Sequence, residues 1–260
     1  MQVRDIVRAL EKFAPLPLQD SYDNSGLQIG LTTAEVSGAL LCLDVTEAVI
    51  EEAASEGCNL IVSHHPLLFK GCKRITEEDY VSRCVMSAIR HGIAVYSAHT
   101  SLDNAYKGVT YRMASLLGLG RLQPLLPSPL QGGAGSGLVG EFNEPMSVDG
   151  FLHLVKDTFK ASCVRHNGCT RPLVKRVALC GGAGAFLIPE AMKAGADAFF
   201  TGEIKYHDFF GLEERMLLVD TGHYESEQYT IGLLEEVLHK AYPELPLVKT
   251  TINTNPIKYM

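Results

Sequence analysis

The sequence predicts an α/β protein made of two related lobes. Short apolar runs, typical of buried strands, alternate with amphipathic segments, typical of helices, and this alternation favours parallel strands joined by crossover helices. It occurs twice along the chain, and a segment rich in Pro, Gly and Ser separates the two stretches. We therefore expect an N-terminal α/β lobe at residues 1–120, a connection at 121–145 and a C-terminal α/β lobe at 146–260.

Local signals support the elements of the N-terminal lobe. Apolar positions at helical spacing open the chain, and a polar loop follows them. Thr46 and Gly57 have the residue types of an N-cap and a helix stop around one helix. The predicted helices are at 3–13, 46–57, 76–91 and 108–120, and the predicted strands are at 38–45, 58–65 and 93–100.

The C-terminal lobe repeats the same alternation. Its predicted helices are at 146–159, 184–195, 205–215 and 225–241, and its predicted strands are at 161–168, 174–180, 196–203, 216–223 and 246–253. Within the connection, only the stretch "GLVGEF" has the pattern of a short strand.

Composition and charge limit the classes of function. The 260 residues are 46% hydrophobic and 20% charged, which is typical of a globular protein. The net charge of −7 gives no general attraction to nucleic acid or to an anionic membrane. Seven cysteines without a C-x-x-C pair indicate reduced thiols. No apolar run approaches 18 residues and the first helix does not resemble a signal peptide, so we expect a cytoplasmic protein with no membrane partner.

Ionisable side chains stand where the predicted strands end. In open α/β sheets, ligands bind beyond the carboxyl ends of the strands. The residues at these positions are Asp44, His64, His65, His99, Asp103, Glu203 and His223. The pattern predicts a metal or substrate site at these strand ends.

The stretch "LIVSHHPLLF" places two histidines, His64 and His65, directly after an apolar strand. Neighbouring side chains of a regular strand point to opposite faces. At a strand end the backbone turns, and Pro66 favours an extended conformation at His65. Both rings can then face one cavity from different sides, which suits two metal ions. The competing interpretation is one buried histidine with a satisfied ring beside one exposed histidine.

Two further motifs carry carboxylates. Asp103 lies four residues after His99 in "HTSLDNA", where an Asx-turn or an N-cap is the competing interpretation. His223 and Glu227 have i, i+4 spacing at the start of a predicted helix, which places both side chains on one face. For this pair the competing interpretation is a capped helix start with a favourable glutamate in its first turn.

Together the motifs supply three imidazoles and two carboxylates. These are His64, His65, Asp103, His223 and Glu227. Imidazole with carboxylate suits Zn, Mn, Fe, Co or Ni, and the lack of thiolate ligands argues against a structural cysteine–zinc site. Five protein ligands are too many for one catalytic ion with open positions, whereas they suit two bridged ions. The sequence therefore predicts a dinuclear site for divalent metal ions.

Five motifs carry a family resemblance that spans nearly the whole chain. They are "SYDNSGLQIG", "IVSHHPLLFKG", "AHTSLDNA", "VALCGGAGAFLIPEAMKAGADAFFTGEIKYHD" and "DTGHYESE". In this combination and order the sequence resembles the Nif-three-like family, which includes the YbgI proteins and the GTP cyclohydrolase 1 type 2 homologues. The chain differs from many relatives in having Tyr22 where they carry a tryptophan. It also lacks the extra domain that some relatives carry between the lobes.

The resemblance implies a dinuclear metal site in the cleft between two related α/β lobes. It also implies self-assembly into a toroidal homohexamer, a trimer of dimers with its metal sites facing an internal cavity. The family's metal ligands fall on the five residues named above, with Glu227 as the bridge between the ions. His99 and Glu203 lie in matching motifs and are expected to be catalytic or to orient the ligands, and His207 is a weaker candidate of the same kind.

The function expected from these features is metal-dependent hydrolysis of a small-molecule substrate such as a nucleotide or phosphoester, with His99 or Glu203 moving a proton. No P-loop is present, because "GGAGAFL" lacks the Lys-Ser/Thr of that motif. Its glycines either cradle an anion at a helix start or allow close strand–helix packing. The alternative is a non-catalytic metal-binding chaperone or regulatory ring protein that contacts nucleic acid or protein. A net charge of −7 argues against strong DNA binding.

Overall fold

The structure, a computed structural model, describes residues 1–260 as a mixed α/β protein with two β-sheets. Backbone contacts divide the chain into two compact units. The first unit comprises Met1–Leu102 and Thr230–Pro256, and the second comprises Asp103–Tyr229 and Ile257–Met260. The predicted α/β class is therefore confirmed.

The first unit contains a five-stranded sheet in the order β1-β4-β3-β2-β11. Its strands are β1 (Gly26–Ile29), β2 (Ala39–Cys42), β3 (Leu60–Ser63), β4 (Ala94–Ser97) and β11 (Leu247–Lys249). Strands β4, β3, β2 and β11 run parallel, whereas β1 pairs antiparallel with β4. The parallel arrangement of β2, β3 and β4 agrees with the alternation in the sequence and aligns their carboxyl ends at one edge.

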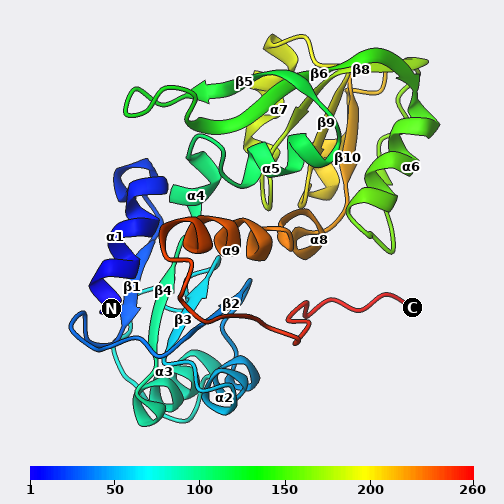
Figure 1. Ribbon diagram of the computed structural model, residues 1–260. Coiled ribbons are helices and arrows are strands. Elements are labelled where there is room, and N and C mark those ends of the chain that lie inside the picture. The colour runs from blue at the N-terminus through cyan, green and yellow to red at the C-terminus, as the bar shows by residue number, and fades with distance from the viewer. The chain divides into compact units, whose positions relative to one another are not determined.

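Helices cover both faces of this sheet (Figure 1). They are α1 (Val3–Phe13), η1 (Leu16–Leu18), α2 (Glu47–Ser55), α3 (Tyr80–His91) and α9 (Thr230–Ala241). Ile50 of α2 and Val85 of α3 belong to one buried apolar cluster with Leu40, Ile61 and Val95 of the sheet. On the other side, α9 lies against α1, β2 and β11. Burial of both faces explains why β2 is apolar at every position and why β3 and β4 have a polar serine only at their last position.

Side-chain caps set the limits of α2 and α3. Thr46 accepts a hydrogen bond from the backbone of Val49 (3.3 Å), as its position in the sequence predicts. In α3, Asp79 accepts from the backbone of Ser82 (2.9 Å), so the helix begins later than the predicted start at residue 76. Gly92 ends α3 in the left-handed conformation, with φ of 66°.

The second unit contains a six-stranded sheet in the order β5-β6-β8-β9-β10-β7. Its strands are β5 (Gly120–Pro127), β6 (Gly135–Ser147), β7 (Arg165–His166), β8 (Leu173–Leu179), β9 (Ala198–Thr201) and β10 (Leu217–Asp220). Strands β8, β9 and β10 are parallel, and the remaining pairs are antiparallel. The three parallel strands again align their carboxyl ends.

Short helices accompany this second sheet (Figure 1). They are α5 (Val109–Leu116), α6 (Val148–Thr158), η2 (Ala185–Leu187), α7 (Ile188–Lys193), η3 (Tyr206–Phe209) and α8 (His223–Glu227), while α4 (Thr100–Asn104) spans the boundary between the units. The side chains of consecutive residues in β9 lie on opposite faces of the sheet, as strand geometry requires. Phe200 packs in a cluster with Phe151 of α6, whereas Phe199 packs with Leu187 and Ala191 beside α7.

The two units divide the chain differently from the predicted lobes. The segment 121–145, expected to connect the lobes, lies largely in β5 and β6 of the second sheet. Pro124 fits there because β5 is an edge strand, where proline is tolerated. Residues 230–256, expected in the C-terminal lobe, belong to the first unit because β11 pairs with β2.

Several segments also differ from the elements predicted for them. The polar loop after α1 contains an additional strand, β1. The helix predicted at 205–215 is only the single turn η3, and Gly211 in its second half has φ of 79°. The helix predicted at 225–241 is two helices, α8 and α9, interrupted between Glu227 and Thr230.

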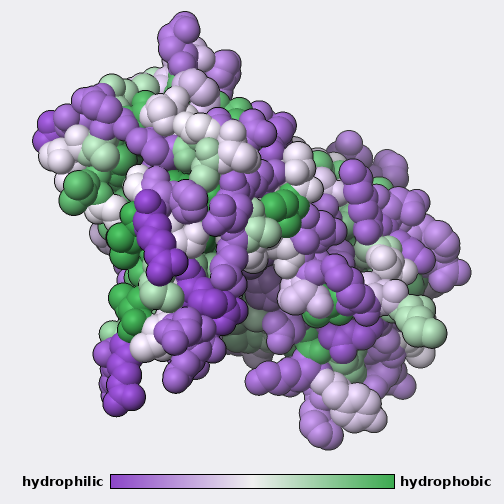
Figure 2. Space-filling view, turned by 90° about the horizontal axis from the view of Figure 1, so that it is seen from below, coloured by the Kyte–Doolittle hydropathy of each residue, from purple (hydrophilic) through white to green (hydrophobic).

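Polar residues cover most of the face seen in Figure 2, with apolar residues dispersed among them. No helix is both long and apolar enough to cross a membrane. No two cysteines form a disulfide, and Cys42, Cys58, Cys84 and Cys180 are buried, whereas Cys72 and Cys163 are exposed.

Candidate metal centre

The carboxyl edge of the first sheet brings three histidines together. His64 and His65 directly follow β3, and His99 follows the adjacent parallel strand β4. One ring nitrogen from each of the three lies within 4.8 Å of the others. The ring centroids of His64 and His65 are 4.8 Å apart, and that of His99 lies 5.4 and 5.5 Å from them. His99, expected to be catalytic, thus stands inside a group of metal-type donors.

Each of the three rings has an acceptor at Nδ1. The His64 Nδ1 lies 3.2 Å from the carbonyl oxygen of Ala98. The His65 Nδ1 lies 2.7 Å from Asp44 Oδ1, and the His99 Nδ1 lies 2.7 Å from Asp23 Oδ1. With Nδ1 donating to these oxygens, a neutral imidazole carries its lone pair on Nε2, the atom that can bind a metal. Such orientation by carboxylates and carbonyls is typical of metal-binding histidines.

The two orienting carboxylates are themselves held in place. Thr254 donates to Asp44 (2.6 Å), while the backbone of Thr100 (3.0 Å) and the hydroxyl of Ser25 (2.8 Å) donate to Asp23. Burial on its own would raise the pKa of the Asp23 carboxyl, but hydrogen bonds from His99, Thr100 and Ser25 hold that pKa well below its usual range. Asp44 shows the same balance, with the hydrogen bond from His65 lowering its pKa against the effect of burial. Both acids are therefore ionised acceptors at neutral pH.

A second donor group lies within the second unit. His223 and Glu227 are at the two ends of α8, and the His223 Nε2 lies 3.2 Å from Glu227 Oε2. The carboxylates of Asp103 and Glu227 offer oxygens within 4.8 Å of each other. Glu203, directly beyond β9, places Oε2 3.3 Å from the His223 Nδ1, the position of an orienting partner. The i, i+4 spacing of His223 and Glu227 thus brings their side chains together as predicted.

The glycine run after β8 makes room for Glu227. Gly182 has φ of 56°, and a Cβ added there would collide with Glu227 Oε1 and lie 3.1 Å from the His223 ring. At Gly181 an added Cβ would meet Glu227 Cγ at 3.2 Å. The Gly182 amide also donates to Ser226 Oγ of α8 (3.1 Å). These glycines allow close packing against α8 and its carboxylate, the second of the two interpretations of "GGAGAFL".

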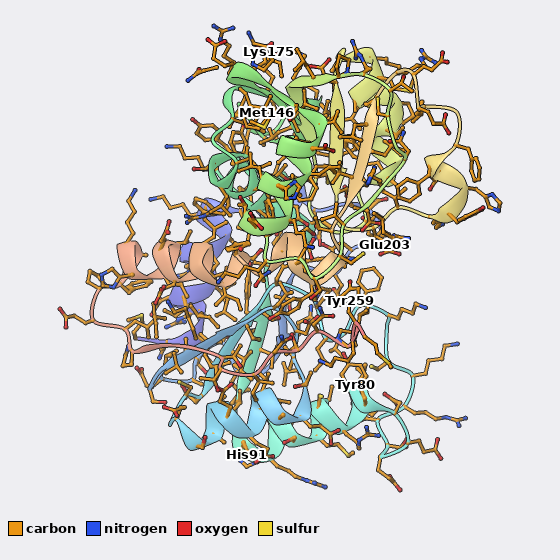
Figure 3. The ribbon with its side chains drawn as sticks, turned by 90° about the vertical axis from the view of Figure 1, so that its right-hand side faces the viewer. Tyr80, His91, Met146, Lys175, Glu203 and Tyr259 are labelled. Carbon is orange, nitrogen blue, oxygen red and sulfur yellow. The ribbon has the colours of Figure 1, made fainter.

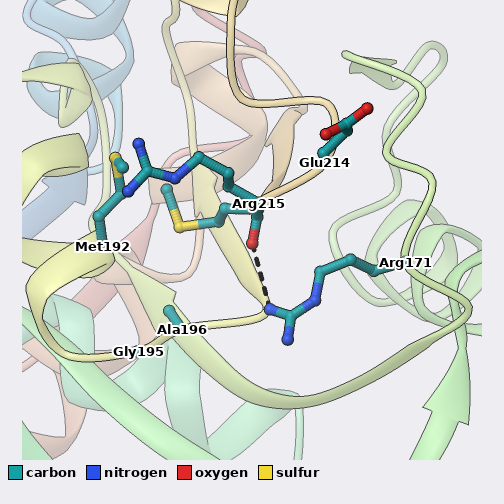
Figure 4. A pocket seen from close by; sticks show the side chains of 7 residues that line it. Arg171, Met192, Gly195, Ala196, Glu214 and Arg215 are labelled. Carbon is teal, nitrogen blue, oxygen red and sulfur yellow. Dashed lines mark hydrogen bonds between the residues drawn. The ribbon is translucent and has the colours of Figure 1, made fainter.

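Two other features lack a group of metal donors. His207 lies in η3, where its neighbours are the rings of Tyr206 (5.2 Å between centroids) and Phe210 (6.3 Å). A hollow of about 370 Å³ in the second unit is lined by Arg171, Met192 and Arg215, among others (Figure 4). Arg171 donates to the carbonyl of Arg215 (3.1 Å). Glu214 is the only metal-type donor there, so this hollow does not suit a cation.

The sequence did not reveal Asp23 as the orienting partner of His99, nor the contact of Gly181 and Gly182 with Glu227. Asp23 lies in a polar loop, and only its place in the motif "SYDNSG" marks it. Asp44 was recognised as a strand-end residue, but its contact with His65 was not predicted. The positive φ of Gly182 and its nearness to Glu227 depend on contacts between residues distant in sequence.

The fold and these donors define a class of protein. It is a mixed α/β protein with two sheets whose carboxyl edges carry groups of histidines and carboxylates that could hold a metal ion. Residues 1–256 match the model of the family described as Duf34/NIF3 (NGG1p interacting factor 3). The chain belongs to this family, which confirms the resemblance in the sequence motifs.

Known relatives match over the full length of the chain. A protein of Clostridium acetobutylicum named "GTP cyclohydrolase 1 type 2 homolog" is 32% identical over 265 residues, covering 100% of this chain and 99% of the relative. The crystal structure of Staphylococcus aureus protein SA1388 matches with a TM-score of 0.90 at 27% identity, covering 100% and 99% of the two chains. Reduced HcgD from Methanocaldococcus jannaschii matches with a TM-score of 0.81 at 26% identity, covering 97% and 98%.

Proposed function

We propose that this protein binds two divalent metal ions and uses them to hydrolyse a small-molecule substrate. The observation that carries the proposal is the histidine group of the first unit, in which each ring is held at Nδ1 by a carboxylate or a carbonyl. We further propose that His64 and His65 would hold the ions together with Asp103, His223 and Glu227.

The chemistry of the donors fits such ions. Imidazole nitrogens with carboxylate oxygens suit Zn, Mn, Fe, Co or Ni, and no cysteine belongs to either donor group. Asp44 and Glu203 hold the rings of His65 and His223 at Nδ1 and so supply the orienting contacts that metal-binding histidines need. The names of the relatives support hydrolysis, because they are called homologues of a cyclohydrolase. A nucleotide or phosphoester is the substrate class that we propose.

Two divalent ions would supply Lewis-acid activation of water and of the substrate's oxygens. The protein's own residues would orient the ligands and move protons. His99 donates its Nδ1 proton to Asp23, so its Nε2 is the basic atom and can accept a proton from a reacting water. Asp23 stabilises the imidazolium that results. Glu203 holds the His223 ring at Nδ1 and thereby directs its Nε2.

Titration of metal-free protein with Zn²⁺ or Mn²⁺ in a calorimeter tests the binding step. We expect about two ions per chain and a loss of binding in Glu227→Gln and in the double variant His64→Ala/His65→Ala. His153→Ala is the matched control, because this exposed histidine on α6 only contacts the carbonyl of Asp149. Wild-type protein that binds neither metal would contradict the proposal.

The catalytic step needs a separate measurement. Metal-loaded protein is assayed for hydrolysis of nucleoside triphosphates, cyclic nucleotides and aryl phosphates. We expect turnover that His99→Gln lowers by about 10²–10⁴-fold without loss of bound metal. Stoichiometric metal binding with no hydrolysis of any of these compounds would favour the alternative, a non-catalytic metal-binding chaperone or regulator.

Assembly into a toroidal homohexamer belongs to the same proposal, and its support is the family resemblance. Analytical ultracentrifugation tests it directly. We expect a species six times the 28.3 kDa mass of the chain. A monomer at all concentrations would contradict the hexamer and leave the metal site to be tested by itself.

A further inference from the structure

A cavity of about 320 Å³ lies in the second unit beside His223. One side of its lining comes from strand-end residues, including Glu203, Asp220 and Thr221. The other side includes Ile257 and Tyr259 from the last four residues of the chain. Figure 3 shows Glu203 and Tyr259 near each other, with the Tyr259 ring toward this region. The proposed function uses Glu203 and His223 but gives no role to the rest of this cavity.

The charges around the cavity do not favour an anion. Arg165 is the only Lys or Arg in the lining, and its guanidinium forms an ion pair with the buried carboxylate of Asp220. The same guanidinium donates to the carbonyl of Ile204 (3.0 Å), and Asp220 also accepts from the Ile204 amide (2.8 Å). The positive charge of Arg165 is thus neutralised, and Glu203 adds a negative charge to the lining.

Polar groups in the lining have hydrogen-bonding capacity that the protein does not use. Glu203 contacts His223 through Oε2, while its Oε1 has no partner and its side chain is 56% exposed. Thr221 is 1% exposed, and its hydroxyl has no hydrogen-bond partner. A buried hydroxyl without a partner costs free energy, which a ligand or water can recover. The charge of Glu203 makes N–H groups the preferred donors to it.

Two residues near the end of the chain, Ile257 and Tyr259, form an apolar part of the cavity lining. Ile257 and Tyr259 are 53% and 47% exposed, although both line the cavity. Burial and the nearby acids, Glu225 and Asp220 among them, raise the pKa of the Tyr259 phenol, so the ring is neutral at physiological pH. A half-exposed neutral aromatic ring is a favourable surface for stacking a flat ligand.

We propose that this cavity binds the planar, amino-substituted heterocycle of a nucleoside-type ligand. In this arrangement the amino group donates to Glu203 and the ring face packs on Tyr259. That this ligand is part of the substrate rests on the proposed function. The binding itself requires no metal and can be tested separately. The proposal assigns a specificity role to the C-terminal residues, which place Tyr259 at the cavity.

Calorimetry with metal-free protein tests the proposal with two nucleosides that carry no phosphate. Guanosine and inosine differ only in one amino group. We expect guanosine to bind about tenfold tighter or more, the effect of one hydrogen bond to a charged acceptor. Glu203→Ala should remove this difference, and Glu203→Gln, which keeps a neutral acceptor oxygen, should reduce it. Tyr259→Ala should weaken both nucleosides by about fivefold to hundredfold, whereas Tyr206→Ala, which removes an exposed tyrosine of η3, should change neither.

Alkylation of cysteines gives a second readout that does not depend on a variant. Cys163 lines the cavity, and Cys72 is exposed in the first unit. Guanosine should slow the reaction of Cys163 with iodoacetamide and leave that of Cys72 unchanged, as measured on peptides by mass spectrometry.

Three results would overturn the proposal. They are no binding of either nucleoside at millimolar concentration, equal affinity for the two nucleosides, and displacement of guanosine by inorganic phosphate, which would make the cavity an anion site. Because the protein is free of metal in these measurements, a failure here is distinct from a failure of the metal site.

Discussion

The His99 Nδ1 lies 2.7 Å from Asp23 Oδ1, and the Asp23 side chain is completely buried. This contact joins the end of β4 to the polar loop before β1. The same carboxylate accepts from the Thr100 backbone and from Ser25, so the loop and the histidine are held as one unit. The loop that sequence reasoning described only as polar therefore fixes the orientation of a candidate catalytic side chain.

Replacing Asp23 should loosen the histidine group. We expect Asp23→Ala to lower turnover by about 10–100-fold, the usual effect of removing an orienting partner, and to leave bound metal unchanged, because His99 is the proposed base and not a proposed ligand. Hydrolysis rates and the metal content of the same metal-loaded protein measure the two effects. Asp149→Ala, which removes an exposed acid in the first turn of α6, is the control and should change neither. Unchanged turnover in Asp23→Ala would show that His99 needs no such support for proton transfer.

We expect metal binding to require a glycine at position 182, beside Glu227. Gly182→Ala places a Cβ against the Glu227 carboxylate and also strains a backbone with φ of 56°. Gly195→Ala is a matched control, because Gly195 has φ of 69° but nothing within 4 Å of an added Cβ. Both variants should lose about 1–2 kcal/mol of stability from the left-handed backbone, and only Gly182→Ala should also lose metal. If Gly182→Ala and Gly195→Ala have the same stability and the same metal content, the contact between Gly182 and Glu227 has no role in metal binding.

Thr250 and Thr251, which follow β11, donate hydrogen bonds to Glu52 of α2, and we expect the stability that these bonds add to depend on pH. Burial opposes ionisation of Glu52, but hydrogen bonds from Thr250 and Thr251 lower the pKa of its carboxyl. A carboxyl with a lowered folded pKa adds stability above its unfolded pKa, and this stability is lost as the pH falls through the folded value.

Glu52→Gln should therefore destabilise the protein at pH 7, and this penalty should begin to shrink as the pH falls below about 4, the ordinary pKa of a glutamate, and disappear below the lowered folded pKa. Urea unfolding across this pH range measures the difference. Glu56→Gln, an exposed change one residue past α2, should have no such pH dependence. A penalty for Glu52→Gln that is constant with pH would contradict the assignment.

Much of the fold follows from local sequence patterns. Strands β2, β3 and β4 are short apolar runs between helices, and the Thr46 cap is visible in the sequence. The positions that local patterns missed depend on distant partners. Strand β11 joins β2 across about two hundred residues, and β5 contains prolines that only its edge position makes acceptable.

The donor groups were also predictable in part. The strand-end rule places His64, His65 and His99 together because β3 and β4 are parallel neighbours. Helical spacing pairs His223 with Glu227. Neither rule identifies Asp23 as the acceptor for His99, because the loop that carries Asp23 has no periodicity.

The central claim is that each chain holds two divalent ions through these histidines and carboxylates. Elemental mass spectrometry of untagged protein, purified without added metal or chelator, tests it most directly. The account predicts about two transition-metal ions per wild-type chain, loss of metal from Glu227→Gln and from His64→Ala/His65→Ala, and full retention in His153→Ala. Wild-type protein that contains no transition metal, even after incubation with Zn²⁺, Mn²⁺ or Fe²⁺, would contradict it.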